Sequence, residues 1–600
     1  MSDLLETLGA QLFDRELPFT EPDSRLLVQP SGSGAAVYTA EYERALTSCA
    51  VIRQISITDA SGSDVPIARV LPAQVDWAGG AANLVFAGAE ALSLAINAGH
   101  WRVRLGVARP SLLPDGGRCA PGLPSAPCLS WRIEADRYNQ TLVTRDGASF
   151  VLIELEASHR CRIVLAVGSD LDPPDRTAPH AQLAEEASRR WRAWFDRLPP
   201  LPEHVRGVGQ LAWWTLAANT LRLHNHPTAP VVVPSKLGYV GHWNWDAYFI
   251  AIGLRHGAPE LARAQLDLVL QHQRADGMFV DVIHDTGTLA ATGQLPADDH
   301  RRLASHYGTA ADGADRADCQ SAVVPVTKPP LLAWAANKLL RTSPDDDLRA
   351  RVVDAASRNQ RWWLTCSDTD GDGLAEYLHP YSSGLDDNPV FDHGAPTATP
   401  DLNAYLALQY DELACLAEGT STSHFAAELR NSAAEHTRRL VDGQWSSSQR
   451  RFLPIVRGKR LGPHTITDLL PLITGRLPTA VAEELTADLV DPETFGGDPA
   501  VPTVSRADPA YQAGRMWRGP VWLNTNYLLI EALERAGQSS LARELASRTL
   551  QLVTESGELA EYWDSSNGLR ASRAVPMFSW SAALFLDLAL RWGTSNGGAA

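Results

Sequence analysis

The stretch QLAEEASRRWRAWFDRL at residues 182–198 marks a change in the periodicity of the chain. Its apolar residues recur at helical spacing, and Pro199, Pro200 and Pro202 end the pattern. Beyond it follow about a dozen segments of ordinary helix length, separated by turns that contain Gly, Asp or Pro. Because no strand–helix alternation appears among them, a parallel sheet is disfavoured. We expect this part of the chain to be helical.

The part before this stretch has a different pattern. Its segments are short, rich in β-branched and aromatic residues, and separated by Gly, Asp and Pro. Clear examples are AVYTAEYE (36–43), VIRQISITDA (51–60), WRVRLGVA (101–108) and FVLIELEA (150–157). Such spacing predicts a β-sandwich. We therefore predict a β-sandwich-like domain over 1–180, a linker helix over 181–202 and a helical domain over 203–595.

Helices of this number fit either a superhelical array or a closed double ring, the (α/α)6 barrel. An array would show a repeating consensus, which the sequence lacks. Aromatic and acidic residues instead gather in the loops between helices, as a pocket at one end of a ring requires. The predicted fold is thus mainly α, an (α/α)6 toroid preceded by the sandwich. The long polar stretch 285–318 is either a lid or a disordered segment, and we favour the lid because the stretch lies between two aromatic-rich helical segments.

Composition narrows the classes of function. The 600 residues contain 53 Lys and Arg against 70 Asp and Glu, and the net charge of −17 argues against a nucleic-acid or anionic-membrane partner. No apolar stretch approaches the roughly 20 residues that span a bilayer, and the first residues show no signal-peptide pattern. We therefore expect a cytoplasmic protein, either a monomer or a homodimer.

Seven cysteines without a Cys-x-x-Cys pair predict neither a disulfide framework nor a zinc site. Cys119 and Cys128 flank a Pro-rich loop and could pair. In a cytoplasmic chain, however, we expect free thiols.

The first segment with candidate chemistry is GHWNWDAYFIAIGL (241–254). Trp243, Trp245 and Asp246 lie immediately before or at the start of a predicted helix. Asp246 could simply favour the helix N-terminus, with the tryptophans in the core. Alternatively, the three side chains could form a sugar platform, in which an aromatic face packs on the pyranose ring and the carboxylate accepts hydroxyl hydrogen bonds.

A second segment, RMWRGPVWLNTNYLLIEAL (515–533), gathers polar and aromatic side chains around a Gly-Pro turn that opens a helix. A core helix rarely needs an arginine and two asparagines at its start, so binding and structural roles are equally plausible here. The residues concerned are Trp517, Arg518, Trp522, Asn524 and Asn526.

A third segment, residues 367–393, begins like a calcium loop. Asp368, Asp370 and Asp372 follow the calcium-loop spacing, but His379 stands where an EF-hand needs a bidentate Glu. An EF-hand is thereby excluded, and a lone structural calcium or a plain Asx-rich turn remains, with the turn favoured. Further along, the turn 384–389 holds two adjacent acids. Burial of one of them would raise its pKa, as a general acid needs.

A fourth segment, residues 557–586, places Glu561 and Asp564 before a turn and a strongly apolar helix. Taken alone, each could be a solvated surface acid.

Taken together, these segments resemble a known family. WNWDAYFIAIGL, TKPPLLAWA, SSGLDDNP, MWRGPVWLNTNYLL and EYWDSSNG followed by FSWSAA occur in the order and approximate spacing of glycoside hydrolase family 63. The chain is most similar to the branch of mannosylglycerate and glucosylglycerate hydrolases and more distantly similar to the trehalases. The resemblance covers about residues 185–595.

The resemblance implies an (α/α)6 barrel that hydrolyses α-glycosides with inversion and without a cofactor. The general acid of the family falls on Asp386, and the general base falls on Glu561. The family's −1 subsite falls on Trp245, Asp246, Trp517, Arg518, Gly519 and Trp522. We further predict that the substrate is contacted by Trp243, Lys328, Tyr381, Gly384 and Asn526.

The chain departs from the family pattern at three positions. Ser382 stands where many relatives carry Glu, so a carboxylate expected beside the acid is missing. Lys328 stands in TKPP where Gln is commoner, and could contact an acidic aglycone such as glycerate or form a structural ion pair. Asp387 replaces a usual Asn, which leaves open a shared duty with Asp386.

We therefore predict an exo-acting α-glycosidase, in particular an α-glucosidase, for a small glucoside or a short oligosaccharide end. Two alternatives remain. A disaccharide phosphorylase on the same fold would replace the base and water by phosphate. A non-catalytic glycan-binding protein would account for the altered residues 381–383.

Overall fold

The computed structural model describes residues 2–119, 128–145, 148–168, 178–295, 323–418 and 423–593. Packing divides the chain into two compact units, here called the sheet unit and the helical unit. The sheet unit comprises Met1–Leu198, Trp213–Arg222 and Ser235–Val240. The helical unit comprises Pro199–Ala212, Leu223–Pro234 and Gly241–Ala600. The chain is 41% helix and 25% strand, so the description "mainly α" suits the helical unit alone.

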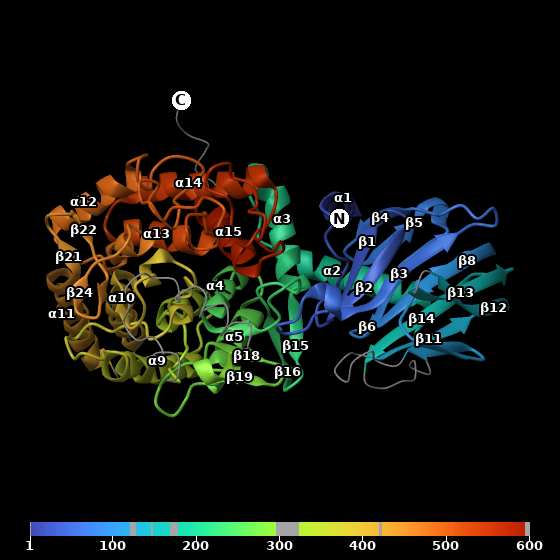
Figure 1. Ribbon diagram of the computed structural model, residues 1–600, viewed down its shortest axis with the longest axis horizontal. Coiled ribbons are helices and arrows are strands. Elements are labelled where there is room, and N and C mark those ends of the chain that lie inside the picture. The colour runs from blue at the N-terminus through green and yellow to red at the C-terminus, as the bar shows by residue number, and fades with distance from the viewer. Residues whose placement is uncertain are drawn as a thin grey trace. The chain divides into compact units, whose positions relative to one another are not determined.

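The sheet unit confirms the expected N-terminal sheet domain (Figure 1). It holds two antiparallel sheets. Buried and exposed side chains alternate in the six-stranded sheet at Arg102–Leu105, where Val103 and Leu105 are buried and Arg102 and Arg104 are exposed. The six-stranded sheet has the order β1 (Leu26–Ser31), β2 (Gly34–Thr39), β3 (Ala50–Thr58), β8 (Gly99–Gly106), β13 (Ala148–Ala157), β12 (Arg137–Arg145). The eight-stranded sheet has the order β4 (Ile67–Leu71), β5 (Gln74–Trp77), β6 (Ala82–Gly88), β7 (Ala91–Ile96), β14 (Cys161–Gly168), β11 (Cys128–Glu134), β10 (Gly116–Cys119), β9 (Pro110–Leu113).

Two helices accompany these sheets. Helix α1 (Ser2–Asp14) packs on β4, and α2 (His180–Phe195) packs on β6 and β7. The helix predicted over 181–202 is α2, which belongs to the sheet unit. Helix α3 (Glu203–Ala218) contributes residues to both units. The chain therefore passes between the units more often than a single linker would require.

In the helical unit, the inner elements pack one on the next and return to the first. The order of contact is α4, α8, α10, the 3₁₀ turn η8, α13, α15 and again α4. Outside them, α5 packs on α4, α9 on α8 and α10, α11 on α10, and α14 on α13 and α15 (Figure 1). The bounds are α4 (Asn244–Leu254), α5 (Pro259–Gln271), α8 (Leu332–Thr342), α9 (Asp346–Cys366), α10 (Pro400–Ala417), α11 (Ala426–Gln444), η8 (Leu470–Thr474), α12 (Thr479–Val490), α13 (Leu523–Arg535), α14 (Ser539–Ser556) and α15 (Ser579–Trp592).

Helix α4 is an inner element that is covered on every side. All of its residues are buried, because neighbours cover it from several directions. Its closest approach is to α15, where a Cβ atom on Gly253 would lie 2.4 Å from the Cα of Ala583. The glycine thus permits the two inner helices to touch through their backbones.

Short strands complete the fold. They are β15 (Thr220–Leu223), β16 (His226–Val232), β17 (His242–Trp243), β18 (Val282–His284), β19 (Gly287–Leu289), β20 (Thr397–Ala398), β21 (Trp445–Ser446), β22 (Arg451–Phe452), β23 (Ile455–Val456) and β24 (Lys459–Arg460). The predicted lid 285–318 begins with β19 and the 3₁₀ turn η3 (Thr292–Gln294), and its larger part, from residue 296 on, lies outside the described residues.

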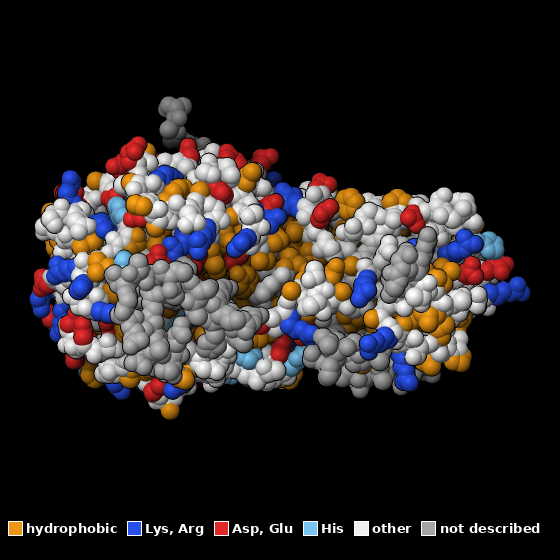
Figure 2. Space-filling model, in the orientation of Figure 1, with side chains coloured by type: hydrophobic (Ala, Val, Ile, Leu, Met, Phe, Trp, Pro, Cys, Tyr) orange, Lys and Arg blue, Asp and Glu red, His pale blue; other side chains and the backbone are white. Residues whose placement is uncertain are grey.

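Three further expectations concern the surface and the thiols. Cys119 and Cys128 are both free thiols. Among the described residues, no helix is both long and apolar enough to cross a membrane. On the face shown in Figure 2, acidic and basic side chains are interspersed.

Candidate active site

The predicted site residues gather where the inner helices begin. Asp246 lies in the first turn of α4, and Trp522 is the residue that precedes α13. Trp580 is the second residue of α15, and Lys328 lies in the segment that leads into α8. The sequence therefore brings four of its motifs to one end of the inner helices.

Aromatic side chains form a continuous cluster at this end. The rings of Trp517 and Trp522 stack with centroids 3.5 Å apart and planes 8° apart. Trp245 meets Trp517 at 6.2 Å and Trp580 at 5.6 Å, and Tyr562 stacks on Trp522 at 4.5 Å. All of these residues are buried. Such packing fixes the rings rigidly, as a sugar subsite requires.

Two members of the cluster were missed as candidates. Trp580 and Tyr562 both lie inside quoted motifs, FSWSAA and EYWDSSNG, but their motifs alone did not separate them from core residues. By contrast, the predicted Trp243 is only half-buried and lies in β17.

A group of acids surrounds Lys328. Its Nζ lies 2.7 Å from Oδ1 of Asp281 and donates a 2.6 Å hydrogen bond to the carbonyl of Tyr381. Asp246 and Asp386 also lie within electrostatic range of this ammonium group. The negative charge of Glu561 in turn raises the pKa of Asp246. Lys328, Asp281, Asp246, Asp386 and Glu561 are called the charged cluster below.

Burial dominates the titration of this cluster. It raises the pKa of Asp246 well above its ordinary value, and Asp281 and Glu561 add to the rise, while Lys328 opposes it. Burial also raises the pKa of Asp281, against the attraction of Lys328. The pKa of Lys328 is itself raised, because the nearby carboxylates outweigh its burial. Raised carboxyl pKa values are typical of sites that use an acid as a proton donor.

Asp281 was not anticipated from the sequence. It interrupts the apolar run Phe279-Val280-Asp281-Val282-Ile283, and the side chain is 2% exposed. A lone acid in such a run must have a partner, and this was the signal that could have revealed it.

The two adjacent acids of the turn 384–389 have different surroundings. Asp387 accepts hydrogen bonds from the backbone N–H of Trp517 at 2.9 Å and from Nε of Arg515 at 3.3 Å. Asp386 instead lies within electrostatic range of Lys328. This arrangement favours an anchoring role for Asp387, which ties its turn to the turn that carries Trp517.

Glu561 is buried and held by the backbone. Its Oε2 accepts a 3.1 Å hydrogen bond from the N–H of Val575, and its own N–H donates to the Val575 carbonyl at 2.8 Å. Asp564, three residues on, is half-buried and accepts hydrogen bonds from Ser566 within a local turn. The two acids of this segment are thereby distinguished, with Glu561 inside the site and Asp564 in the turn.

Gly384 is required by its geometry. Its φ of 71° lies in the left-handed region, and a Cβ atom there would lie 2.1 Å from the indole of Trp245. Gly519 is similarly confined, since a Cβ atom would lie 2.7 Å from the carbonyl oxygen of Gln512. Both glycines therefore allow segments of the site to approach closely.

Two polar side chains predicted to bind the substrate already have partners within the protein. Arg518 is buried and paired with Asp392, to which its Nη1 donates at 3.0 Å. The Asn526 amide donates to the Val501 carbonyl at 2.9 Å and accepts from the Val501 N–H at 3.1 Å. These contacts favour a supporting role for Asn526, beneath the aromatic cluster.

The segment 381–383 lies against Thr327 and Lys328. Oγ of Ser382 accepts a 3.2 Å hydrogen bond from the Thr327 N–H, and the carbonyl of Tyr381 accepts from Lys328. The position where relatives carry Glu is therefore a structural contact here.

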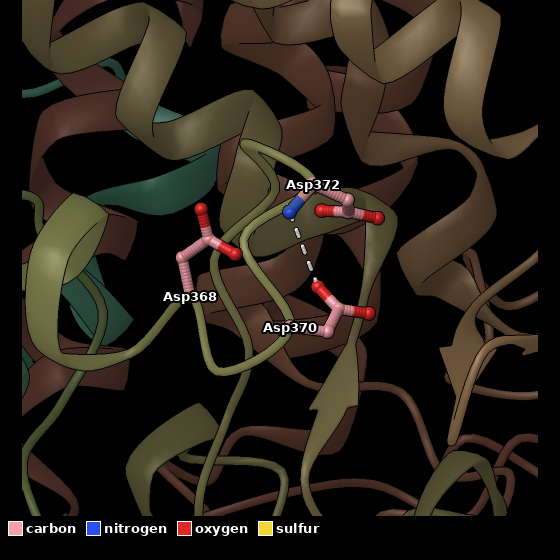
Figure 3. A group of neighbouring side chains, drawn as sticks. All are labelled: Asp368, Asp370 and Asp372. Atoms are coloured by element: carbon pink, nitrogen blue, oxygen red, sulfur yellow. Dashed lines mark hydrogen bonds between the residues drawn. The ribbon is translucent and has the colours of Figure 1, made fainter.

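The calcium candidate lies in a separate loop. The carboxylates of Asp368, Asp370 and Asp372 each offer an oxygen within 4.8 Å of the others (Figure 3). The same carboxylates accept backbone N–H bonds, with Gly371 and Gly373 donating to Asp368 at 2.8 and 3.0 Å. These bonds are those of an Asx-rich turn, and calcium binding remains a prediction.

Comparison with known proteins identifies the family to which the chain belongs. Residues 239–581 match the mannosylglycerate hydrolase MGH1-like glycoside hydrolase domain. The chain belongs to this family. It is a glycoside hydrolase of family 63, in the mannosylglycerate hydrolase branch.

Individual relatives each match about three fifths of the chain. Mannosylglycerate hydrolase MGH1 of Selaginella moellendorffii is 25% identical over 421 residues, 59% of this chain and 81% of the relative. Glucosylglycerate hydrolase of Mycolicibacterium hassiacum is 25% identical over 450 residues, 62% of this chain and 96% of the relative. The structure of GH63 mannosylglycerate hydrolase from Thermus thermophilus with glucose matches with a TM-score of 0.50 and 24% identity, over 63% and 99% of the two chains.

Proposed function

We propose that this glycoside hydrolase is an inverting, exo-acting α-glycosidase, with Asp386 as general acid and Glu561 as general base. The observation that carries the proposal is the charged cluster, because it links Asp386, through Lys328 and Asp246, to Glu561. Two acids that lie 175 positions apart in the sequence thereby act in one electrostatic environment.

In the proposed reaction, one acid donates a proton and the other accepts one. Protonated Asp386 would donate its proton to the glycosidic oxygen as the bond to the anomeric carbon breaks. Ionised Glu561 would take a proton from the water that attacks the opposite face of the sugar. Inverting enzymes hold such carboxyls roughly 6.5–9.5 Å apart to accommodate this water. This chemistry asks for no cofactor.

The remaining site residues would bind the sugar. Trp245, Trp517 and Trp522 would form the rigid wall of the −1 subsite, and Asp246 would hydrogen-bond sugar hydroxyls. Trp243, which is half-buried, would contact the sugar from the rim. We also propose that the closed order of inner helices is the expected (α/α)6 toroid, with η8 in the place of one inner helix.

For the substrate, we propose a small α-glycoside, either a glycosylglycerate or a short α-glucoside. The names of the relatives support the first class. In this chain Lys328 is occupied by Asp281 and the Tyr381 carbonyl, which favours an internal ion pair over a contact to glycerate. A glycerate carboxylate would therefore need another cation.

The experiment is a hydrolysis screen over glucosylglycerate, mannosylglycerate, trehalose, kojibiose, nigerose, maltose and isomaltose, with and without phosphate. We expect release of free sugar from at least one α-glycoside at a rate independent of phosphate. On that substrate, Asp386→Asn and Glu561→Gln should each lower kcat by at least 100-fold, within the range of general acid–base catalysis of roughly 10²–10⁴. Asp564→Asn is the matched control and should stay active.

Full activity of the Asp386 or Glu561 variant would contradict the assignment of roles. Phosphate-dependent release of a sugar phosphate would instead indicate the phosphorylase. Sugar binding without turnover by the wild-type enzyme would contradict the proposed reaction.

A further inference from the structure

Thr327 and Lys328 hold together two segments that are distant in sequence. The Thr327 hydroxyl donates a 2.6 Å hydrogen bond to the Phe279 carbonyl, and its N–H donates to Ser382. Lys328 repeats this connection one residue later, because it binds both Asp281 and the Tyr381 carbonyl. The turn that leads to Asp386 is thereby fixed to the segment that carries Asp281, immediately before β18.

The Asp281–Lys328 contact is also deeply buried. Lys328 is 6% exposed and Asp281 is 2% exposed, and their charged atoms lie 2.7 Å apart. An ion pair shielded from water acts on nearby groups more strongly than a surface pair. The net charge of the Asp281–Lys328 pair therefore influences the carboxyl groups near it.

The groups that face Lys328 come from three segments. Asp281 precedes β18, Asp246 lies in α4, and Asp386 follows the turn 380–383. Two titratable groups, Asp387 and His379, lie on the same turn region, but Asp387 is bonded to Arg515 and Trp517, and Nδ1 of His379 accepts from the Tyr381 N–H.

We propose that Asp281 and Lys328 form a positioning pair, which places the turn of Asp386 and sets the net charge that this acid experiences. The inference rests on the proposed role of Asp386 and adds two residues to the machinery of the site. Neither residue is assigned contact with the reacting atoms.

The proton on Asp386 depends on the charges around this carboxyl. A general acid must be protonated when the substrate arrives, and a nearby cation favours the ionised form. Asp281 balances the cation and so preserves the proton. Without Lys328, the charges of Asp246 and Asp281 would act on Asp386 without the cation that now offsets them, and this repulsion would favour protonation further.

The test measures the pH dependence of kcat/KM on the substrate found in the screen. The alkaline limb reports the loss of the proton from the acid. Asp281→Asn exposes Asp386 to the full charge of Lys328, so the limb should move to lower pH by about one unit. Lys328→Gln should move the limb to higher pH by about the same amount, since a cation is removed. The double variant is again balanced, and its limb should return close to that of the wild type.

A purely structural pair would lower kcat in all three variants and leave the limb in place, and this result would overturn the proposal. Shifts of both single variants in one direction would overturn it as well. Circular dichroism and thermal melting identify any variant that fails to fold. In that case Lys328→Arg, which keeps the charge, provides the comparison: its limb should coincide with that of the wild type, and a shift would contradict the proposal.

Failure of the proposed function gives a different result. If Asp386→Asn keeps wild-type activity, the limb does not report Asp386, and the assignment of the acid fails first. If Asp386→Asn is inactive but the limb does not move in the variants of the pair, only the positioning proposal fails.

Discussion

The two ends of the inner helices differ in how they treat buried acids. At the N-terminal ends, the charged cluster provides one lysine for four carboxyls, and the pKa values of Asp246 and Asp281 are raised. At the C-terminal ends of α4 and α15, Asp587 accepts from Arg255 at 2.6 Å and bonds to His256 at 2.7 Å. The pKa of Asp587 is lowered, since hydrogen bonding and these cations overcome burial.

Burial is similar at both ends, so it does not explain the difference. Glu531 is also buried, yet its pKa falls to about 2 because Lys338 and Arg591 attract the charged form. The two ends differ instead in the ratio of cationic to acidic side chains. The C-terminal network is built to keep its acids ionised and stabilises the fold, whereas in the charged cluster a single lysine leaves the pKa of Asp246 raised.

The largest effect should come from breaking the C-terminal network. Asp587→Asn leaves Arg255, His256 and Arg591 around a neutral group, and removal of one member of a buried ion pair costs about 3–5 kcal/mol. We expect a loss of this size in urea unfolding, with unchanged specific activity of the folded enzyme. Asp354→Asn, which removes an exposed pair with Arg358 on α9, is the control and should change stability little. A specific activity that falls along with stability would contradict the separation of the two ends.

A substitution in the charged cluster should lower activity and leave stability unchanged or higher. Asp246→Asn removes a carboxylate proposed to bind sugar hydroxyls, and we expect kcat/KM to fall about 100-fold, as the loss of a hydrogen bond to a charged group allows. Its midpoint of thermal unfolding should stay unchanged or rise, because the protein no longer buries an acid whose ionisation is unfavourable. A large loss of stability with unchanged kcat/KM would place Asp246 in the core.

The stabilities of Asp587→Asn and Asp246→Asn should also depend on pH in different ways. The folded-state pKa of Asp587 is lowered, so its stabilisation is present above its unfolded pKa and is lost as pH falls. The deficit of Asp587→Asn should therefore shrink as pH falls below about 5. The folded-state pKa of Asp246 is raised, so the wild type loses stability as pH rises through that value. Asp246→Asn should gain on the wild type between about pH 4 and 7, as chemical denaturation at each pH would measure. Parallel curves for the two variants would contradict the account.

The division of the fold and the grouping of the motifs could be predicted from the sequence, whereas the Asp587 network could not. The change of period at 182–198 separated sheet from helix, and the motifs around Asp246, Asp386 and Glu561 were recognised as one group of candidate site residues. Local patterns suffice for such features, because periodicity and turn residues act over a few positions.

The contacts between motifs could not be predicted. Nothing local distinguishes Asp281 from another acid or shows that Lys328 binds it, because the two residues lie far apart along the chain. The roles of Asn526 and Asp387 also depend on partners in distant turns. For the same reason the sequence pattern did not show that Trp213–Arg222 returns to the sheet unit.

The smallest effect is expected in the loop that holds the three aspartates. Asp370 is exposed and its carboxylate accepts from the N–H of Asp372 (Figure 3). If the loop is an Asx-rich turn, Asp370→Asn should leave activity unchanged, and addition of calcium or of EGTA should shift the midpoint of thermal unfolding by about 1 °C or less. A calcium-dependent rise of several degrees that Asp370→Asn abolishes would establish a structural calcium site.

The most direct test of the proposed reaction is the configuration of the sugar at the moment of release. Proton NMR of the wild-type enzyme on its α-glycoside substrate resolves the two anomers before they equilibrate. The proposed action of Asp386 and Glu561 on opposite faces of the sugar predicts that the β-anomer appears first. First appearance of the α-anomer would contradict the proposed roles of both acids.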